Sequence, residues 1–391
     1  MRTEWLDERL RADLVAWRRN LHACPELGFQ EHRTAAFVAE RLRRFGLEVR
    51  AGVAQTGVVA MLGREGPVVL ARADMDALPI QEESEVDYRS QTPGVMHACG
   101  HDGHTAMLLA VARLLAARTD EIRGRVKFMF QPAEEEHGGA LPMVEAGVLT
   151  DPPVQAAFAC HLWNDLDVGK IGVRSGAMFA ATDALEITVS GQGGHGAAPH
   201  QTVDAVLAAC QVVTLLQSVV SRSVNPLRAA VVTIGAIHGG GAPNIIPPEV
   251  RLRGTIRSFE PDVRETVLAR VREVAEGVCA AAGARAEVCL TAGYPATVND
   301  PEMVDLVRAA AADVVGWDNV VELDPSMGGE DMAFVLQRVP GAYFAVGSRN
   351  EARGLSLPHH NPRFDFDEEA LSVGAETMAH VLDATLRKFA R

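Results

Sequence analysis

The sequence predicts an α/β fold in which a mostly parallel mixed sheet with flanking helices is interrupted by a smaller α+β domain. Strand and helix patterns alternate up to Asp183, a rhythm typical of parallel sheets built from βαβ units. After Asp183 the strands alternate apolar and polar residues, as half-exposed antiparallel strands do. The length of 391 residues fits about two domains at roughly 100–200 residues each.

The elements of the larger domain follow from hydrophobic spacing. Apolar residues at helical spacing predict a helix that ends at Gly46, a residue suited to a C-cap. Short apolar runs predict strands, and a second helical pattern lies between them. In order, we expect a helix at 31–46, a strand at 66–73, a helix at 105–117, strands at 125–130 and 154–160, a helix at 301–315, a strand at 342–347 and a last helix from about 367.

The inserted domain has the order strand, helix, strand, strand, helix, strand. The first strand is DALEITVSGQG, and the second helix begins at Pro261, where a proline fits the first helical turn. Further elements are expected at 203–220, 228–239, 248–259 and 261–282. We therefore assign 1–182 and 294–391 to one discontinuous domain and 183–293 to the insert.

Composition excludes several classes of partner. Lys plus Arg number 37 and Asp plus Glu 51, so the formal net charge is −14, which argues against nucleic acid and anionic membranes. No segment reaches the roughly 18 uninterrupted apolar residues of a membrane span, and the charged N-terminus lacks a signal core. A cytoplasmic protein is expected. The six cysteines are mostly far apart and contain no CxxC, so a disulfide scaffold is not expected.

Polar side chains gather where the predicted strands end. In an open α/β sheet, ligands bind beyond the carboxyl ends of the strands. The residues placed there are Asp74, Asp76, Glu134, Glu135, Glu136, His161, His359 and His360, and a further cluster at the start of a helix holds His97, Cys99, His101 and His104. Carboxylates, imidazoles and one thiol delivered to one edge predict a metal site.

Each cluster also has a plainer interpretation. Cys99 and His101 are spaced to bind zinc or another first-row transition metal, but they also fit a buried cysteine beside a helix-capping histidine. His161 could equally be a hydrogen-bonded core histidine. Asp74 and Asp76 fit surface turns, or partners that orient metal-bound imidazoles.

The acidic run after strand 125–130 is either a solvated loop or a site with divided roles. Adjacent carboxylates point in different directions, so one of Glu134 and Glu135 could bind metal while the other handles a proton. His97 and His104 are expected to support the site or to pack.

The insert carries three polar residues of another kind. His195 lies in the glycine-rich turn GQGGHGAAP, Asn244 in a second such turn, and Arg257 near the end of a strand. Guanidinium binds carboxylates bidentately, so an Arg with an Asn amide suits a carboxylate ligand. The alternative is ordinary hairpin turns with a surface arginine.

Taken together, these segments resemble the M20 metallopeptidase superfamily, in particular its amidohydrolase branch of hippurate hydrolases, N-acyl-amino-acid amidohydrolases and indole-acetyl-amino-acid hydrolases. The resemblance covers nearly the whole chain. It rests on RRNLHACPELGFQE, RADMDALPI, MHACGHDGHTAMLL, FMFQPAEE, GGHGAAPH, NIIPPEVRLRGTIRS, MGGEDMAFVL and HHNPRFDFDEEAL, in this order.

The resemblance implies a di-metal exopeptidase-like catalytic domain and an inserted ferredoxin-like lid that makes a homodimer or higher homo-oligomer. It implies two divalent metal ions per subunit (Mn, Zn, Co or Ni). The roles carried over are metal ligation by Cys99, His101, Glu135, His161 and His360, general base and acid catalysis by Glu134, oxyanion contact by His195, often in the partner subunit, substrate carboxylate binding by Asn244 and Arg257, and support of a metal-side residue by Asp76.

The activity expected from the resemblance is hydrolysis of hippurate-like or N-acetyl amino acids to a carboxylate and a free amino acid. Alternatives are a dipeptidase or carboxypeptidase, a dedicated deacetylase of the N-acetyl-diaminopimelate type, and a non-catalytic protein that binds acyl amino acids or metal. The chain departs from the family pattern at Glu136 and His137, and either residue could alter substrate preference or pH dependence.

Overall fold

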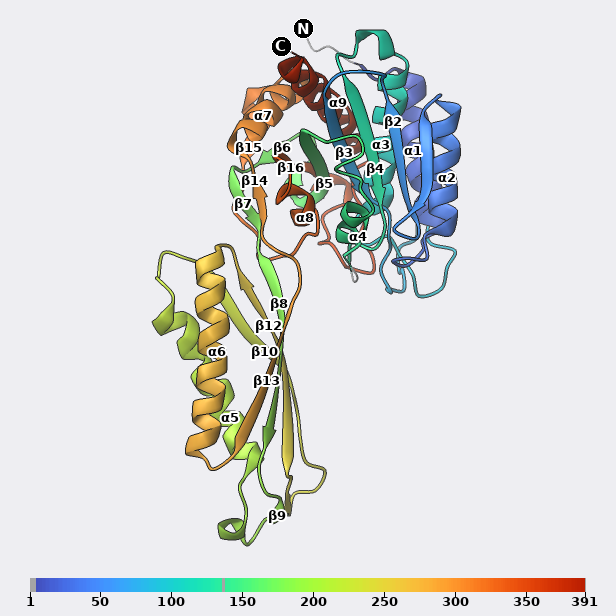
Figure 1. Cartoon of the computed structure of the whole chain (residues 1–391). Coiled ribbons are helices and arrows are strands. Elements are labelled where there is room, and N and C mark those ends of the chain that lie inside the picture. Colours follow the sequence, from blue (N-terminus) through green and yellow to red (C-terminus); the bar gives the residue numbers. More distant parts are fainter. Residues whose placement is uncertain (1–4, 136–137, 391) are drawn as a thin grey trace. The chain divides into compact units, whose positions relative to one another are not determined.

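The computed structural model describes residues 5–135 and 138–390. The chain divides into two compact units (Figure 1). The first unit contains Met1–Met178, Thr297–Asp324 and Asp331–Arg391, and the second contains Phe179–Ala296 and Pro325–Glu330. The insert thus begins at Phe179 and ends at Ala296, and the short segment Pro325–Glu330 clusters with it.

The first unit is built on an eight-stranded mixed sheet with the strand order β1-β2-β4-β3-β5-β16-β6-β15. The pairs β3–β4, β3–β5, β5–β16 and β6–β15 are parallel, so the predicted mostly parallel sheet is confirmed. The strands are β1 (Glu48–Val53), β2 (Gly57–Leu62), β3 (Val68–Asp74), β4 (Arg125–Gln131), β5 (Ala156–Asp167), β6 (Ile171–Val173), β15 (Val320–Glu322) and β16 (Gly341–Arg349). A separate two-stranded ladder joins β7 (Gly176–Phe179) and β14 (Thr297–Asn299).

Two groups of helices pack in this unit. The larger group is α1 (Glu8–Ala23), α2 (His32–Arg44), α3 (His101–Ala116), α7 (Pro301–Val315) and α9 (Glu369–Phe389), and the smaller is α4 (Ala140–Glu145) with α8 (Ala333–Leu336). Figure 1 shows α3 and α9 lying along the central strands. Helix α3 is buried along almost its whole length, because it lies between the sheet and the helices α1 and α9. It begins at His101 rather than at the predicted 105, so that histidine belongs to its first turn.

The second unit has the predicted order of strands and helices. Its antiparallel sheet runs β10-β12-β8-β13, with helices α5 and α6 packed together against it. The elements are β8 (Ala181–Ser190), β9 (Gly194–His195), α5 (Ala205–Ser218), β10 (Ala230–His238), β11 (Ile245–Ile246), β12 (Glu249–Ser258), α6 (Pro261–Ala281) and β13 (Arg285–Ala292). Strand β8 alternates buried and more exposed residues, as expected when only one face of a sheet is covered by helices.

The helical stretch Ala205–Ser223 is long and apolar enough to cross a membrane by length and composition. Its buried residues, among them Ala208, Val212 and Leu216, belong to the core of the second unit. One third of the apolar stretch is buried in this way. Its other face exposes Leu207 and Leu215, which are 57% and 46% accessible.

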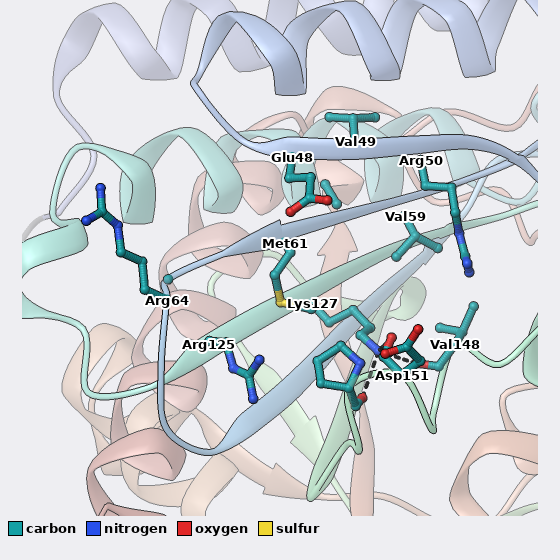
Figure 2. A pocket seen from close by; sticks show the side chains of 13 residues that line it. Glu48, Val49, Arg50, Val59, Met61, Arg64, Arg125, Lys127, Val148 and Asp151 are labelled. Carbon is teal, nitrogen blue, oxygen red and sulfur yellow. Dashed lines mark hydrogen bonds between the residues drawn. The ribbon is translucent and has the colours of Figure 1, made fainter.

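A pocket of about 520 Å³ lies at the amino end of β4 (Figure 2). Lys127 on β4 is buried, and its ammonium donates hydrogen bonds to the carbonyls of Val148, Asp151 and Pro152 at 2.6–3.0 Å. Three acceptors satisfy the three donors of the ammonium. Burial nevertheless lowers the pKa of Lys127 to about 8. The pocket is lined by none of the predicted site residues, because those lie beyond the opposite end of this strand.

Candidate metal centre

The centre is assembled where β3, β4 and β5 run toward one edge of the sheet, beside the start of α3. Asp74 is the last residue of β3, and His101 is the first residue of α3. The residue before α3, Gly100, has a φ of 88°, a conformation that glycine adopts without penalty. This turn places Cys99 and His101 in the same cluster.

Hydrogen bonds fix the orientation of the His101 ring. Its Nδ1 lies 3.0 Å from the backbone carbonyl and 3.2 Å from the carboxylate of Asp76. Both partners are acceptors, so Nδ1 carries a proton, and Nε2 is the ring atom that would bind a metal. Asp76 also accepts the backbone N–H of Glu135 at 3.0 Å. One buried aspartate therefore holds residues from two of the converging segments.

His161 is oriented in the same way. Its Nδ1 lies 2.5 Å from the carbonyl of Leu162, and its Nε2 lies 3.5 Å from the sulfur of Cys99. His359 Nε2 is 2.9 Å from the same Leu162 carbonyl, so this ring nitrogen is already used as a donor. The next residue, His360, lies elsewhere, with its Nε2 beside Glu135.

His360 and Glu135 approach each other, with Nε2 and Oε1 3.3 Å apart. Cys99, Glu135 and His360 form one group whose ligand atoms all lie within 4.8 Å of one another, and His101, Glu134 and Glu135 form another. Glu134 is buried, whereas half of the His360 side chain is exposed. The predicted ligands and Glu134 therefore lie in one continuous cluster.

His104 and Asp74 also lie beside this cluster but are engaged with each other. His104 Nδ1 donates to Asp74 at 2.6 Å, and its Nε2 accepts the backbone N–H of Leu162 at 2.9 Å. An imidazole whose second nitrogen accepts a backbone hydrogen bond has no lone pair left for a metal. His104 therefore supports the site, and Asp74 also pairs with Arg72 at 2.7 Å.

The electrostatics of the cluster call for a cation. Burial raises the pKa of the Cys99 thiol well above its usual value, and Glu135, Glu134 and Asp74 raise it further. Burial alone would lower the pKa of His101, but the carboxylates around it raise it to about 10. The neighbouring carboxylates raise both pKa values, which shows that negative charge is concentrated around these two side chains.

The donor set fits divalent metal ions. Two buried atoms at its centre, His101 Nε2 and Glu135 Oε1, have no hydrogen-bond partner among the described residues. Burial and then His104 and His359 lower the pKa of His161, which keeps that imidazole neutral, as metal ligation requires. Thiolate, imidazole and carboxylate together suit zinc and other first-row transition metals.

The polar residues predicted in the insert lie at two places in the second unit. His195 on β9 pairs with Ile245 of β11, and Gly196 donates its N–H to the carbonyl of Asn244 at 2.8 Å, so His195 and Asn244 are neighbours. Arg257 is opposite Thr182 at the other end of the sheet. At about 3.3 Å per residue, positions 249 and 257 of β12 are roughly 26 Å apart, and β9 and β11 lie beyond position 249.

Several supporting residues escaped prediction from sequence. Asp331 accepts hydrogen bonds from Arg72, from Gln131 at the end of β4, and from the N–H of Ala140. The charged residue inside the apolar run VVLARA was the available signal, because a buried arginine needs a carboxylate partner. Glu136 and His137, which depart from the family pattern, lie outside the described residues.

Residues 70–384 match the sequence profile of peptidase family M20/M25/M40. The chain is 47% identical over 300 residues to the N-acyl-L-amino acid amidohydrolase of Geobacillus stearothermophilus, covering 76% of this chain and 80% of that protein. It is 41% identical over 378 residues to the N-acetylcysteine deacetylase of Bacillus subtilis, covering 96% and 97%. It is 41% identical over 375 residues to thermostable carboxypeptidase 2 of Saccharolobus solfataricus, covering 94% of each.

A similar solved structure is that of the YxeP protein of Bacillus subtilis, described as a dinuclear metal-binding peptidase from the M20 family. The TM-score is 0.86 at 37% sequence identity, and the match covers 97% of this chain and 99% of that one. The similarity in fold and in sequence thus agrees with the donor set, which fits divalent metal ions.

Proposed function

Since the chain belongs to peptidase family M20/M25/M40, we propose that it is a metal-dependent amidohydrolase of N-acyl amino acids. The reaction releases a carboxylic acid and a free amino acid. One observation carries the proposal: buried Glu134 lies against a cluster of thiol, imidazole and carboxylate donors in which two buried atoms lack a hydrogen-bond partner among the described residues.

Cys99, His101, Glu135, His161 and His360 would hold two divalent metal ions, which polarise the substrate carbonyl and acidify water when bound. Glu134 accepts the proton of the attacking water and returns it to the leaving amine. The residues around the cluster keep each ligand in one orientation, as Asp76 does for His101.

We propose that three residues of the second unit contact the substrate. His195 contacts the oxyanion, while Asn244 and Arg257 bind the α-carboxylate. Because Arg257 lies roughly 26 Å along the sheet from the level of Asn244, one small substrate cannot touch both residues of one subunit. A homodimer in which His195 and Asn244 serve the partner's site resolves this, and the exposed apolar face of α5 supports self-association.

A panel of substrates tests the proposal. Hippurate and N-acetyl-L-methionine should be hydrolysed by protein reconstituted with Mn, Zn, Co or Ni, and exhaustive chelation should abolish turnover. Full activity in metal-free protein would refute the metal-dependent reaction. Failure to hydrolyse any acyl amino acid with any of these metals would refute the substrate class.

Carboxypeptidase activity is a second candidate, because a relative with 41% identity is named a thermostable carboxypeptidase. Both reactions cleave an amide next to a free carboxylate. Including the peptides hippuryl-phenylalanine and alanyl-phenylalanine in the panel separates them: faster cleavage of a peptide than of hippurate would favour this candidate.

A dedicated deacetylase would prefer one acetylated compound. Non-catalytic binding is disfavoured, since a binding protein has no need of Glu134. The native metal and a cytoplasmic location stay predictions.

A further inference from the structure

The turn that carries Glu134 and Glu135 begins with an unusual backbone conformation. Strand β4 ends at Gln131, and Ala133 then adopts a φ of 53°. This left-handed conformation is unfavourable for a residue with a Cβ. One hydrogen bond within the turn, from the Gly139 N–H to the Ala133 carbonyl at 3.0 Å, holds one side of this residue, and a contact from outside the turn holds its N–H.

The contact that holds it comes from Glu31. One carboxylate oxygen of Glu31 accepts the backbone N–H of Ala133 at 2.8 Å, and the other accepts the hydroxyl of Thr56 at 2.5 Å. Glu31, Ala133 and Thr56 are all buried. The carboxylate thus joins the residue before α2 to the residue before Glu134.

Glu135 and Ala140, which are described on either side of positions 136 and 137, are anchored in a similar way. Asp76 accepts the N–H of Glu135, and Asp331 accepts the N–H of Ala140. The turn also closes tightly, because a Cβ at Gly139 would lie 1.9 Å from the carbonyl oxygen of Pro132. Of these anchors, Glu31 is the one that holds the N–H of Ala133, the residue immediately before Glu134.

We propose that Glu31 is a positioning residue for Glu134. By holding the N–H of Ala133 in its left-handed conformation, Glu31 contributes to the direction in which the next side chain leaves the backbone. The consequence for catalysis rests on the proposed function, since it assumes that Glu134 transfers the proton. The consequence for the backbone does not depend on it.

The interaction needs an acceptor and not a negative charge. Burial raises the pKa of Glu31, and a glutamine in its place keeps an oxygen for Ala133 while its amide faces the Thr56 hydroxyl. Glu31→Gln should therefore preserve the turn. Glu31→Ala leaves the Ala133 N–H without its partner.

The experiment compares these two variants in steady-state kinetics of metal-loaded enzyme. Glu31→Ala should lower kcat about 10- to 100-fold with KM changed less than about threefold, because small misplacements of a reacting group cost about this much. Metal content should stay at the wild-type value, and Glu31→Gln should recover most of kcat. Unchanged kcat in folded Glu31→Ala protein would overturn the catalytic role.

Two control variants separate positioning from stability. Thr56→Val removes the other hydrogen bond of the same carboxylate. Glu26→Ala removes the carboxylate that accepts the backbone N–H groups of Arg33 and Thr34 in α2, the helix that Glu31 precedes. Both should lower the melting temperature and leave kcat unchanged. A loss of kcat in the controls equal to that in Glu31→Ala would overturn the proposal.

Hydrogen exchange supplies a readout that needs no substrate. The Ala133 amide should exchange at least about tenfold faster in Glu31→Ala than in wild type or Thr56→Val, because its acceptor is lost. Equal protection in all three proteins would overturn the proposal. If wild-type enzyme hydrolyses no acyl amino acid, the proposed function fails, and this exchange measurement still decides the role of Glu31.

Discussion

The side chains of Arg18 and Asp102 are wholly buried and form an ion pair at 2.8 Å. Arg18 also pairs with Asp365 at 2.7 Å. Asp102 directly follows His101, and Asp365 lies in the loop after His360. Helix α1 is therefore tied, through one guanidinium, to two segments that carry proposed metal ligands.

Replacing Arg18 by methionine should lower the free energy of unfolding by about 3–5 kcal/mol, because two buried carboxylates lose their cation. Urea unfolding measures the loss. Arg19→Met is the matched control, since the Arg19 side chain is 47% exposed in its pair with Glu368 and such pairs contribute below about 1 kcal/mol. Similar losses in both variants would contradict this account.

His22 makes stability depend on pH. Burial lowers its pKa, but Asp102 at 2.8 Å and Glu82 at 3.2 Å outweigh burial and raise it above 6.5. A raised pKa in the folded state means that the stabilisation is complete below about pH 6.5 and is lost as pH rises through the folded value.

His22→Gln should therefore destabilise the protein more at pH 6 than at pH 9. Urea unfolding of both proteins at each pH gives the difference in free energy of unfolding, in which the contributions of other groups cancel. A difference that stays constant, or that grows toward alkaline pH, would show that the imidazolium is not what stabilises the network.

The buried pair of Arg18 and Asp102 shows where prediction from sequence stops. The ends of apolar runs drew attention to Asp74 and His161, because local patterns indicate where strands lie. Asp74 does end β3, but His161 lies inside β5, which continues to Asp167 and not only to the predicted 160. Arg18 and Asp102 are 84 positions apart, and no local pattern indicates that a charged helix will bury an arginine against a distant carboxylate.

The same limit applies to parts of the fold. Helix α1 and strand β1 were not predicted, since the polar residues of α1 mask its buried stripe and β1 is largely exposed. Strand β2 was also missed, although its run GVVAML is apolar and mostly buried. The start of α3 was placed too late, because the segment from His101 to His104 reads as a polar turn. Tertiary burial of those residues extends the helix.

Glu134 and Glu135 should separate in their effects. Glu134→Gln should lower kcat by at least about 100-fold while metal content stays unchanged, because it removes the proton acceptor but no ligand. Glu135→Gln should lose metal, since Glu135 lies with Cys99 and His360. Plasma emission spectrometry gives the metal content, and the opposite pattern would exchange the two roles.

His360 and His359 provide a similar comparison at the last ligand. His360→Ala should reduce bound metal, because His360 Nε2 lies beside Glu135. His359→Ala should retain it, because His359 Nε2 donates to the Leu162 carbonyl. Equal metal loss, measured after dialysis against the same metal buffer, would contradict this assignment of the two neighbouring histidines.

The proposed exchange of His195 between subunits can be tested by mixing two inactive variants. Glu134→Gln protein lacks the proton acceptor but keeps His195, and His195→Ala protein has the reverse defect. If His195 serves the partner's site, each mixed dimer contains one site with both residues intact.

Unfolding and refolding the two variants together at equal concentration should therefore restore about one quarter of wild-type activity, since half of the randomly formed dimers are mixed and one of their two sites is complete. Each variant refolded alone is the control. If His195 acts within its own subunit, every site in the mixture lacks one residue, and activity should not exceed that of the separate variants.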